Sequence, residues 1–229
     1  MSKLAMLFGR FTGGAVVALA LLVGSPAYAA PTSLSPGATA LSLNTDPFVA
    51  GNSVLFGNDS FSSLDASSFS GVLYWGLWTN IALNPYGSDK LTFYYSLKND
   101  STSVSSLDRL TITGFQGFQT SVGLDGCAGW GITCIDAVTA DRSANGDVIG
   151  WDFLSTNPVT PGDYSRDLVI YTDATNFGGA TYNVIDGSVA VGSTIAPIPE
   201  PEVYAMLAAG LGLMGFVARR RKKSESGIV

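Results

Sequence analysis

Residues 91–98 read LTFYYSLK, and this short stretch decides the predicted fold. Every second side chain from Leu91 to Leu97 belongs to one apolar set, and more polar side chains lie between them, which is the period of a β-strand. Turn-forming residues stand on both sides, with Asn-Pro-Tyr-Gly at 84–87 and Asn-Asp at 99–100. The pattern therefore predicts a β-strand that turns one face toward a core.

Several other runs in the middle of the chain have the same character. Residues 72–78 are apolar on both faces, which is typical of a central strand covered on both sides. Shorter strands are expected at 109–113, 148–153, 167–171, 182–185 and 189–195. The helical spacing of 3.6 residues is not sustained anywhere in this region. We therefore expect an all-β domain of about seven to nine strands, an antiparallel β-sandwich or a jelly roll.

Composition excludes several classes of chemistry. The 229-residue chain has no His, so Ser-His-Asp triads, Cys-His dyads and His-ligated metal sites are excluded. Residues 30–198 contain five basic residues against fifteen Asp and no Glu, a formal charge of −10. Such a charge argues against nucleic acid as a partner and against docking on anionic lipid.

The N-terminus has the features of a secretory signal peptide. Lys3 and Arg10 form a positive region, and an apolar run follows at 15–23. This run is too short to cross a hydrocarbon core of about 30 Å. The A-x-A pattern at 27–29 predicts cleavage between Ala29 and Ala30, so residues 1–29 are expected to be removed on export.

The C-terminus carries a second signal in three parts. Pro199-Glu200-Pro201 comes first, an apolar stretch follows at 203–218, and Arg219-Arg220-Arg221 with two lysines follows at once. As a helix the apolar stretch would be about 24 Å long, close to a membrane span. We expect one transmembrane helix with the basic cluster on the cytoplasmic side and a short cytoplasmic tail at 224–229.

These three parts, in this order and spacing, resemble the PEP-CTERM sorting signal of Gram-negative bacteria. The resemblance covers about 197–223 and implies that an exosortase-type enzyme recognises Pro199-Glu200-Pro201, with Arg219-Arg220-Arg221 as the retention stop. It further implies export across the inner membrane, transient anchoring, and a final place on the cell surface or in the extracellular matrix. A plain membrane-anchored periplasmic protein is the alternative.

The two signals leave a secreted ectodomain at 30–198, followed by the sorting signal at 199–223. PEP-CTERM systems are associated with exopolysaccharide and biofilm matrix, so the resemblance implies a structural or glycan-contacting role. Segments 140–143 and 165–187 look like an ectodomain type that recurs before such tails, one that brings no assigned activity.

The two cysteines and a tryptophan between them form a candidate site. Cys127 and Cys134 in an exported chain predict a disulfide, because a metal site would need further thiol or imidazole ligands. The loop that they close presents Trp130, our candidate ligand contact. Aromatic side chains elsewhere offer further stacking faces for a sugar, although aromatics in a β-sandwich usually belong to the core. The candidates are Trp75, Trp78, Trp151, Tyr74, Tyr94, Tyr95 and Tyr164.

One stretch has the spacing of a calcium loop. Oxygen-bearing side chains at Asp141, Ser143, Asn145, Asp147 and Asp152 surround Gly146, which is the layout that a hard cation needs. The final ligand is Asp instead of the longer Glu, and no helix is expected on either side. We favour a β-hairpin whose Asn145-Gly146 forms a type I′ turn, and expect no cofactor.

An enzyme is the less favoured function. Fifteen Asp offer many pairs for glycoside hydrolysis, but the sequence singles out none of them. Without Glu or His in 30–198, few groups could serve as a general acid near neutral pH. A secreted hydrolase that uses an Asp pair therefore stands as the alternative to a binding or structural protein.

Overall fold

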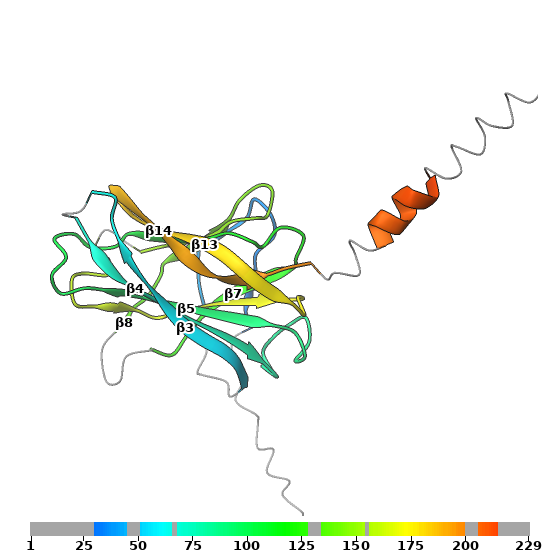
Figure 1. Cartoon of the computed structure of the whole chain (residues 1–229). Helices are drawn as coiled ribbons and strands as arrows, with labels where there is room; N and C mark the ends of the chain where they lie inside the picture. Colours follow the sequence, from blue (N-terminus) through cyan, green and yellow to red (C-terminus); the bar gives the residue numbers. More distant parts are fainter. Residues whose placement is uncertain are drawn as a thin grey trace, which may run out of the picture.

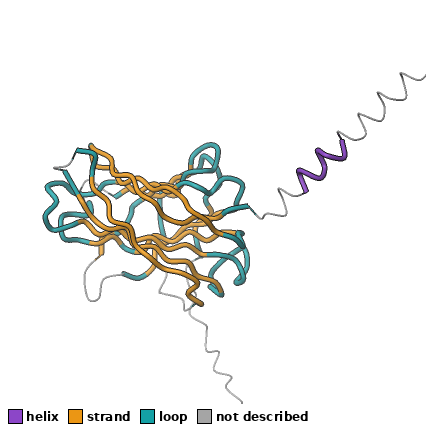
Figure 2. The backbone as a smooth tube through the Cα atoms, viewed as in Figure 1, coloured by secondary structure: helices purple, strands orange, loops and turns teal. Residues whose placement is uncertain are grey.

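The structure is a computed structural model that describes residues 30–44, 51–65, 68–127, 134–153, 156–199 and 206–214. Figure 1 shows two layers of strands, and Figure 2 shows how loops join them at both ends. The predicted signal peptide at 1–29 lies outside the described residues, so its cleavage between Ala29 and Ala30 stays a prediction. The expectation of an all-β domain is confirmed.

The described residues form fourteen strands. They are β1 (Thr32–Ser33), β2 (Thr39–Ala40), β3 (Asn52–Ser62), β4 (Ser70–Thr79), β5 (Thr92–Asn99), β6 (Arg109–Ile112), β7 (Thr120–Asp125), β8 (Cys134–Ile135), β9 (Thr139–Arg142), β10 (Ile149–Asp152), β11 (Tyr164–Ser165), β12 (Asp167–Thr172), β13 (Phe177–Asp186) and β14 (Ser188–Pro197). Each strand expected from the sequence coincides with one of them. The structure has more strands than the seven to nine expected, because several strands are only two residues long and others were not predicted.

The strands form two sheets. In the first, β1, β7, β12, β5, β4 and β3 are successive neighbours, and the short β11 pairs with the end of β5 and with β8. In the second, the order is β14-β13-β6-β10-β9-β2. All pairs are antiparallel except β8 with β11. Chain neighbours are therefore often in different sheets, which places residues far apart in sequence side by side.

One core lies between the inner faces of the two sheets. Phe93 and Tyr95 of the first sheet and Trp151 and Tyr182 of the second are all essentially inaccessible to solvent. The Tyr95 and Trp151 rings lie 6.3 Å apart between centroids. Tyr95 also donates a hydrogen bond of 2.7 Å from its hydroxyl to the Ile195 carbonyl of β14. This bond satisfies a polar group at the centre of the core, where an unmade one would be costly.

Strand β5 is covered on both faces, which the sequence did not indicate. The expected inner set is buried, but Tyr94 and Ser96 on the outer face are 7% and 2% exposed as well. The segment between β4 and β5 supplies part of the cover, because its Ile81 packs with Tyr94 in a second, smaller apolar cluster. Thr92, Tyr94 and Ser96 therefore face a covered surface instead of open solvent, whereas Lys98 near the end of the strand is partly exposed.

Strand β3 was missed altogether. Its sequence, NSVLFGNDSFS, is rich in Asn, Ser, Asp and Gly, residues that are depleted in strands. It forms through long antiparallel pairing with β4, and its other edge has no strand partner among the described residues. Asp59 ties it to the second sheet, because its carboxylate accepts hydrogen bonds from the Tyr182 hydroxyl and the Ser193 amide.

A buried arginine joins three loops at one end of the domain. Arg142, 4% exposed, ends β9 and points its guanidinium at backbone carbonyls. Its acceptors are the carbonyls of Leu34, Phe115, Phe118 and Gly146 and the Thr120 hydroxyl, at 2.6–3.1 Å. No carboxylate among the described residues forms an ion pair with it. The charge is thus solvated by the protein's own backbone.

We expect Arg142→Met to lower the free energy of unfolding by about 3 kcal/mol or more, because several buried carbonyls would lose a charged donor at once. Arg109→Met is the control, since Arg109 is more exposed and binds two surface carboxylates, which are worth about 1 kcal/mol or less. Urea unfolding followed by tryptophan fluorescence measures both. Equal losses in the two variants would contradict the role assigned to Arg142.

Candidate functional site

A row of side chains crosses the outer face of the first sheet and leaves a gap. The backbone register places Phe56 of β3 beside Gly76 of β4, and Gly76 beside Tyr94 of β5. Side chains on successive strands of one row point to the same face. Because Gly76 has no side chain, it leaves an open space between the Phe56 and Tyr94 side chains of this row.

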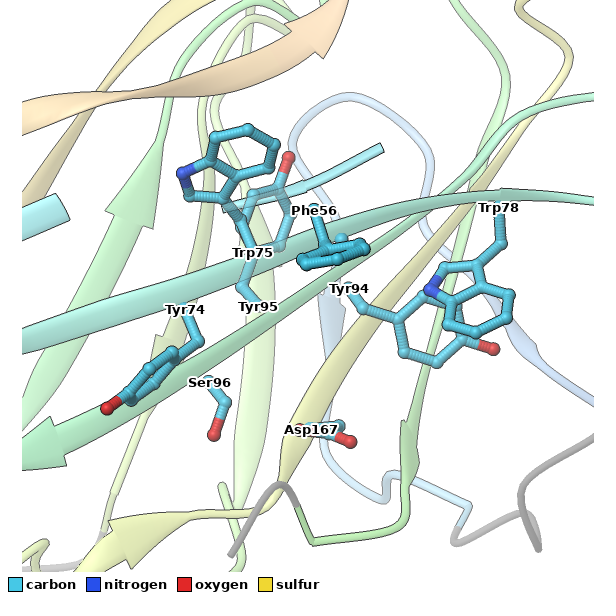
Figure 3. A pocket seen from close by; sticks show the side chains of 9 residues that line it. Phe56, Tyr74, Trp75, Trp78, Tyr94, Tyr95, Ser96 and Asp167 are labelled. Carbon is cyan, nitrogen blue, oxygen red and sulfur yellow. The ribbon is translucent and has the colours of Figure 1, made fainter. Parts of the chain in front are cut away.

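Two neighbours on β4 close the ends of this gap. Tyr74 and Trp78 lie two residues before and after Gly76, so they project from the same face. The result is a cavity of about 170 Å³, which we call the aromatic cavity (Figure 3). It is lined by Phe56, Tyr74, Trp75, Gly76, Trp78, Tyr94, Tyr95, Ser96 and Asp167.

The aromatic rings differ in how firmly the protein holds them. Trp78 and Tyr94 meet edge to face, with centroids 6.0 Å apart and planes at 63°, a favourable geometry for two rings. Phe56, in contrast, leaves 79% of its surface in solvent. A Cβ on Gly76 would lie 3.1 Å from Trp78 Nε1, so even a small side chain there would crowd the cavity. Trp78 and Tyr94 therefore form a wall of the cavity whose rings support each other, whereas most of the Phe56 ring on the other side faces solvent.

A pair of carboxyl groups lies beside the rings. Asp167 opens β12 and lines the cavity, and the register places it directly opposite Asp125 of β7. Asp125 is 2% exposed and accepts hydrogen bonds from the Gly126 amide and the Tyr94 hydroxyl. Tyr94 therefore contacts both groups, because its hydroxyl donates to Asp125 and its ring packs against Trp78.

Burial governs the protonation of this pair. Burial, with the neighbouring charge of Asp125, raises the pKa of Asp167 from 3.8 to about 6, although a hydrogen bond from Ser96 and the charge of Arg166 oppose the shift. Burial likewise raises the pKa of Asp125 and, together with Asp125, that of the Tyr94 hydroxyl. At neutral pH the Asp167 carboxyl is therefore ionised next to aromatic faces.

The aromatic residues expected from the sequence divide between core and cavity. Trp151 and Tyr95 are fully buried, so the core alternative is right for them, and Trp75 packs against the same core. Trp78 and Tyr94 line the aromatic cavity. Trp130, our candidate ligand contact, lies outside the described residues, and its role stays a prediction. Phe56 was not among the candidates because nothing in its polar surroundings predicted strand β3.

The candidate calcium ligands are bound to other groups. Asp141 and Asp152 both pair with Arg109, each at 2.6 Å, and Asp147 accepts from the Gly114 amide at 3.1 Å. In the turn, Ser143 donates to Asn145 Oδ1 at 2.7 Å. Within the described part of the chain, no group of three or more Cys, Asp or Glu side chains could hold a metal ion. Asp141, Asp147 and Asp152 are therefore each held by a partner outside the set of candidate ligands.

The same stretch forms the expected hairpin with a different turn. Strands β9 and β10 pair antiparallel with Arg142 opposite Ile149. The Gly146 amide donates to the Ser143 carbonyl, and Gly146 has φ 76°. A type I′ turn would need Asn145 in the left-handed region too, and it does not lie there. The turn type predicted from the Asn-Gly pair is therefore wrong, since the hairpin loop is longer.

The predicted disulfide is confirmed. Cys127, just after β7, is bonded to Cys134 at the start of β8, with Cα atoms 6.0 Å apart. Because Asp125 ends β7, the bridge lies two residues from the carboxyl pair. The closed loop at 128–133 lies outside the described residues.

The end of the fold meets the predicted sorting signal directly. Strand β14 ends at Pro197, and the Ile198 amide still donates to the Asn176 carbonyl at 3.0 Å. Pro199 follows at once, while Glu200, Pro201 and Arg219-Arg220-Arg221 lie outside the described residues. A helix over 206–214 belongs to the apolar stretch. Among the described residues no helix is both long and apolar enough for a membrane span, so the transmembrane helix at 203–218 stays a prediction.

A comparison with protein families decides what this C-terminal segment is. Residues 197–222 match the model of the PEP-CTERM protein-sorting motif. The chain is a PEP-CTERM protein. The motif implies export, processing by an exosortase-type sorting enzyme, and sorting to the cell envelope or surface. Neither a comparison with curated proteins nor one with solved structures finds a match.

We expect the carboxyl pair to cost stability at neutral pH. The folded pKa of Asp167 lies above the unfolded value of 3.8, so its ionisation opposes folding. The cost is present above about pH 6 and disappears as the pH falls toward about 4. Asp167→Asn should therefore raise the free energy of unfolding at pH 7 by about 1–2 kcal/mol and leave it unchanged near pH 4.

Urea unfolding at several pH values measures this difference, with Asp147→Asn in the β9–β10 turn as the control. A variant that is less stable than the wild type at pH 7, or as stable, would contradict the burial of an ionised Asp167.

We also expect replacement of Pro199-Glu200-Pro201 by three alanines to block processing, because the sorting enzyme would lose its recognition sequence. The mass of the protein recovered from the producing cells, and its distribution between membrane and medium, measure this outcome. Unchanged mass and location would show that the motif is not read.

Proposed function

We propose that this PEP-CTERM protein, once sorted, binds exopolysaccharide of the biofilm matrix through the aromatic cavity. The observation that carries the proposal is Phe56, which is 79% exposed beside the fixed rings of Trp78 and Tyr94. Small-molecule sites are typically concave and lined by apolar and aromatic side chains with a few polar groups, and this cavity has such a lining. Export through the signal peptide, crossing of the inner membrane and transient anchoring through 203–218 are parts of the same proposal.

The chemistry of the cavity suits a sugar. A pyranose presents a face of C–H groups that stacks on an aromatic ring, and hydroxyl groups at its edge that need hydrogen bonds. Phe56 and Trp78 supply ring surface, while the half-buried Asp167 supplies polar atoms in the same lining. The cavity is smaller than the roughly 300–1,000 Å³ of sites that enclose a drug-sized ligand. It therefore suits contact with one unit of a long polymer.

A secreted hydrolase is the second candidate, because Asp125 and Asp167 form a carboxyl pair beside the cavity. Hydrolysis of a glycosidic bond needs both carboxyls to reach the bond from opposite sides. Asp125, at 2% exposure, is covered and held by Tyr94 and the Gly126 amide. This arrangement supports binding more than cleavage.

The test is co-sedimentation of the full-length chain in mild detergent with exopolysaccharide from the producing strain. We expect Phe56→Ala combined with Trp78→Ala to reduce the bound fraction at least about tenfold, because both stacking faces are removed. Leu41→Ala is the control, since Leu41 is 78% exposed and follows β2 of the other sheet.

Equal retention of all three proteins would contradict the proposal and move attention to the disulfide loop with Trp130. Release of reducing ends from the polymer, lost in Asp167→Asn, would favour the hydrolase.

A further inference from the structure

We propose that the aromatic cavity selects a cationic sugar, a hexosamine unit whose amino group is free and protonated. The inference rests on the proposed glycan binding and names the chemical class of the bound unit. It is carried by one juxtaposition: aromatic faces and an ionised carboxyl line the same small cavity, and no basic side chain is among the lining residues.

The ring faces provide the first half of the recognition. Phe56, Trp78 and Tyr94 come from three different strands and line the cavity together (Figure 3). In the strand register, Gly76 is paired with Phe56 on one side and with Tyr94 on the other. An organic ammonium ion is attracted to the face of an aromatic ring, most strongly to Trp, and the attraction increases when water is excluded. Several rings around one small space are the arrangement by which proteins recognise substituted ammonium groups.

The carboxyl pair provides the second half. Neither Asp125 nor Asp167 takes part in an ion pair among the described residues. The nearest cation in sequence, Arg166, donates from Nε to Asp136 at 2.6 Å and is thereby engaged elsewhere. The charge of Arg166 lowers the pKa of both carboxyls but forms no ion pair with either, so the buried Asp125 and the half-buried Asp167 are only partly compensated. A ligand ammonium in the cavity would supply the remaining counter-charge.

The size of the cavity limits what carries the ammonium group. About 170 Å³ holds a single small group, and a side chain on Gly76 would crowd this space because its Cβ would lie 3.1 Å from Trp78 Nε1. A bulky cationic side chain of a protein would also need matching surface around the rim. A hexosamine unit offers an amino group next to an apolar C–H face, which matches a carboxyl next to an aromatic face.

Charge argues against the other sugar classes. The ectodomain carries a formal charge of −10, so an anionic polysaccharide would be repelled over the whole surface as well as in the cavity. A neutral N-acetylated unit keeps the C–H face but loses the charge, and leaves the carboxyl pair only partly compensated. Free amino groups are thus the feature that this cavity distinguishes.

The experiment compares a glucosamine tetramer with an N-acetylglucosamine tetramer as probes for the full-length chain, near neutral pH and at physiological salt. Isothermal titration calorimetry measures the affinity, and quenching of tryptophan fluorescence reports contact with Trp78. We expect the free-amine tetramer to bind about tenfold tighter or more. We expect Asp167→Asn to remove this difference by lowering the affinity for the free-amine tetramer to about that for the N-acetylated tetramer.

Two further variants separate a built site from general attraction. Gly76→Val fills the cavity and should abolish binding of both probes, whereas Asp147→Asn removes the same charge from the other sheet and should change neither affinity. Urea unfolding of Asp167→Asn at the same pH separates loss of binding from loss of the fold.

Four outcomes overturn the inference, and they differ in what they say of the proposed function. Equal affinity for both tetramers, or a preference for the N-acetylated one, refutes cation selection and leaves glycan binding standing. Free-amine binding that Asp167→Asn and Asp147→Asn weaken equally shows diffuse attraction to an acidic surface. Free-amine binding that Gly76→Val leaves intact places the site elsewhere. If the protein binds neither tetramer and also does not bind the strain's own exopolysaccharide, both proposals are refuted.

Discussion

The alternation of side chains along β5 is the constraint on which the rest of the structure depends. Its inner set, with Phe93 and Tyr95, fills the core between the sheets, and its outer set, with Tyr94 and Ser96, forms the floor of the aromatic cavity. A register shift of one residue would turn the inner side chains outward and the outer ones inward, so that both the core packing and the cavity would be lost. Core packing is the stronger demand, so it fixes the register, and the geometry of the cavity follows from it.

The protein uses buried charge in two opposite ways. Arg142 is fully satisfied, because backbone carbonyls and a hydroxyl surround its guanidinium and join three loops. Asp167 and Asp125 are only partly satisfied, because the hydrogen bonds they accept do not balance two neighbouring carboxyls. The first arrangement stabilises one end of the fold. The second leaves an electrostatic cost beside an open cavity, and a cationic ligand of the kind proposed above would relieve it.

The sorting motif and the aromatic cavity lie in separate parts of this PEP-CTERM protein. The sorting motif is a linear signal that begins where β14 ends, and Ile198 is still hydrogen-bonded to the domain. The aromatic cavity is made by β3, β4, β5 and β12 on the outer face of the first sheet. Removal of the sorting segment would leave the four strands that form the cavity in place. The processed domain would thus keep the aromatic cavity.

The sequence by itself determined the features whose signals are local. Alternation in 91–98 predicted β5, the cysteine spacing predicted the disulfide, and the C-terminal motif predicted sorting. The hairpin around Gly146 was predicted correctly, but its turn type was not. The turn depends on hydrogen bonds that the Ser143 and Asn145 side chains form within the loop, and these bonds depend on the length of the loop. Only the tertiary structure brought Phe56 beside Gly76 and Asp125 beside Asp167. These pairs come from strand register, and register depends on the packing of all the strands together.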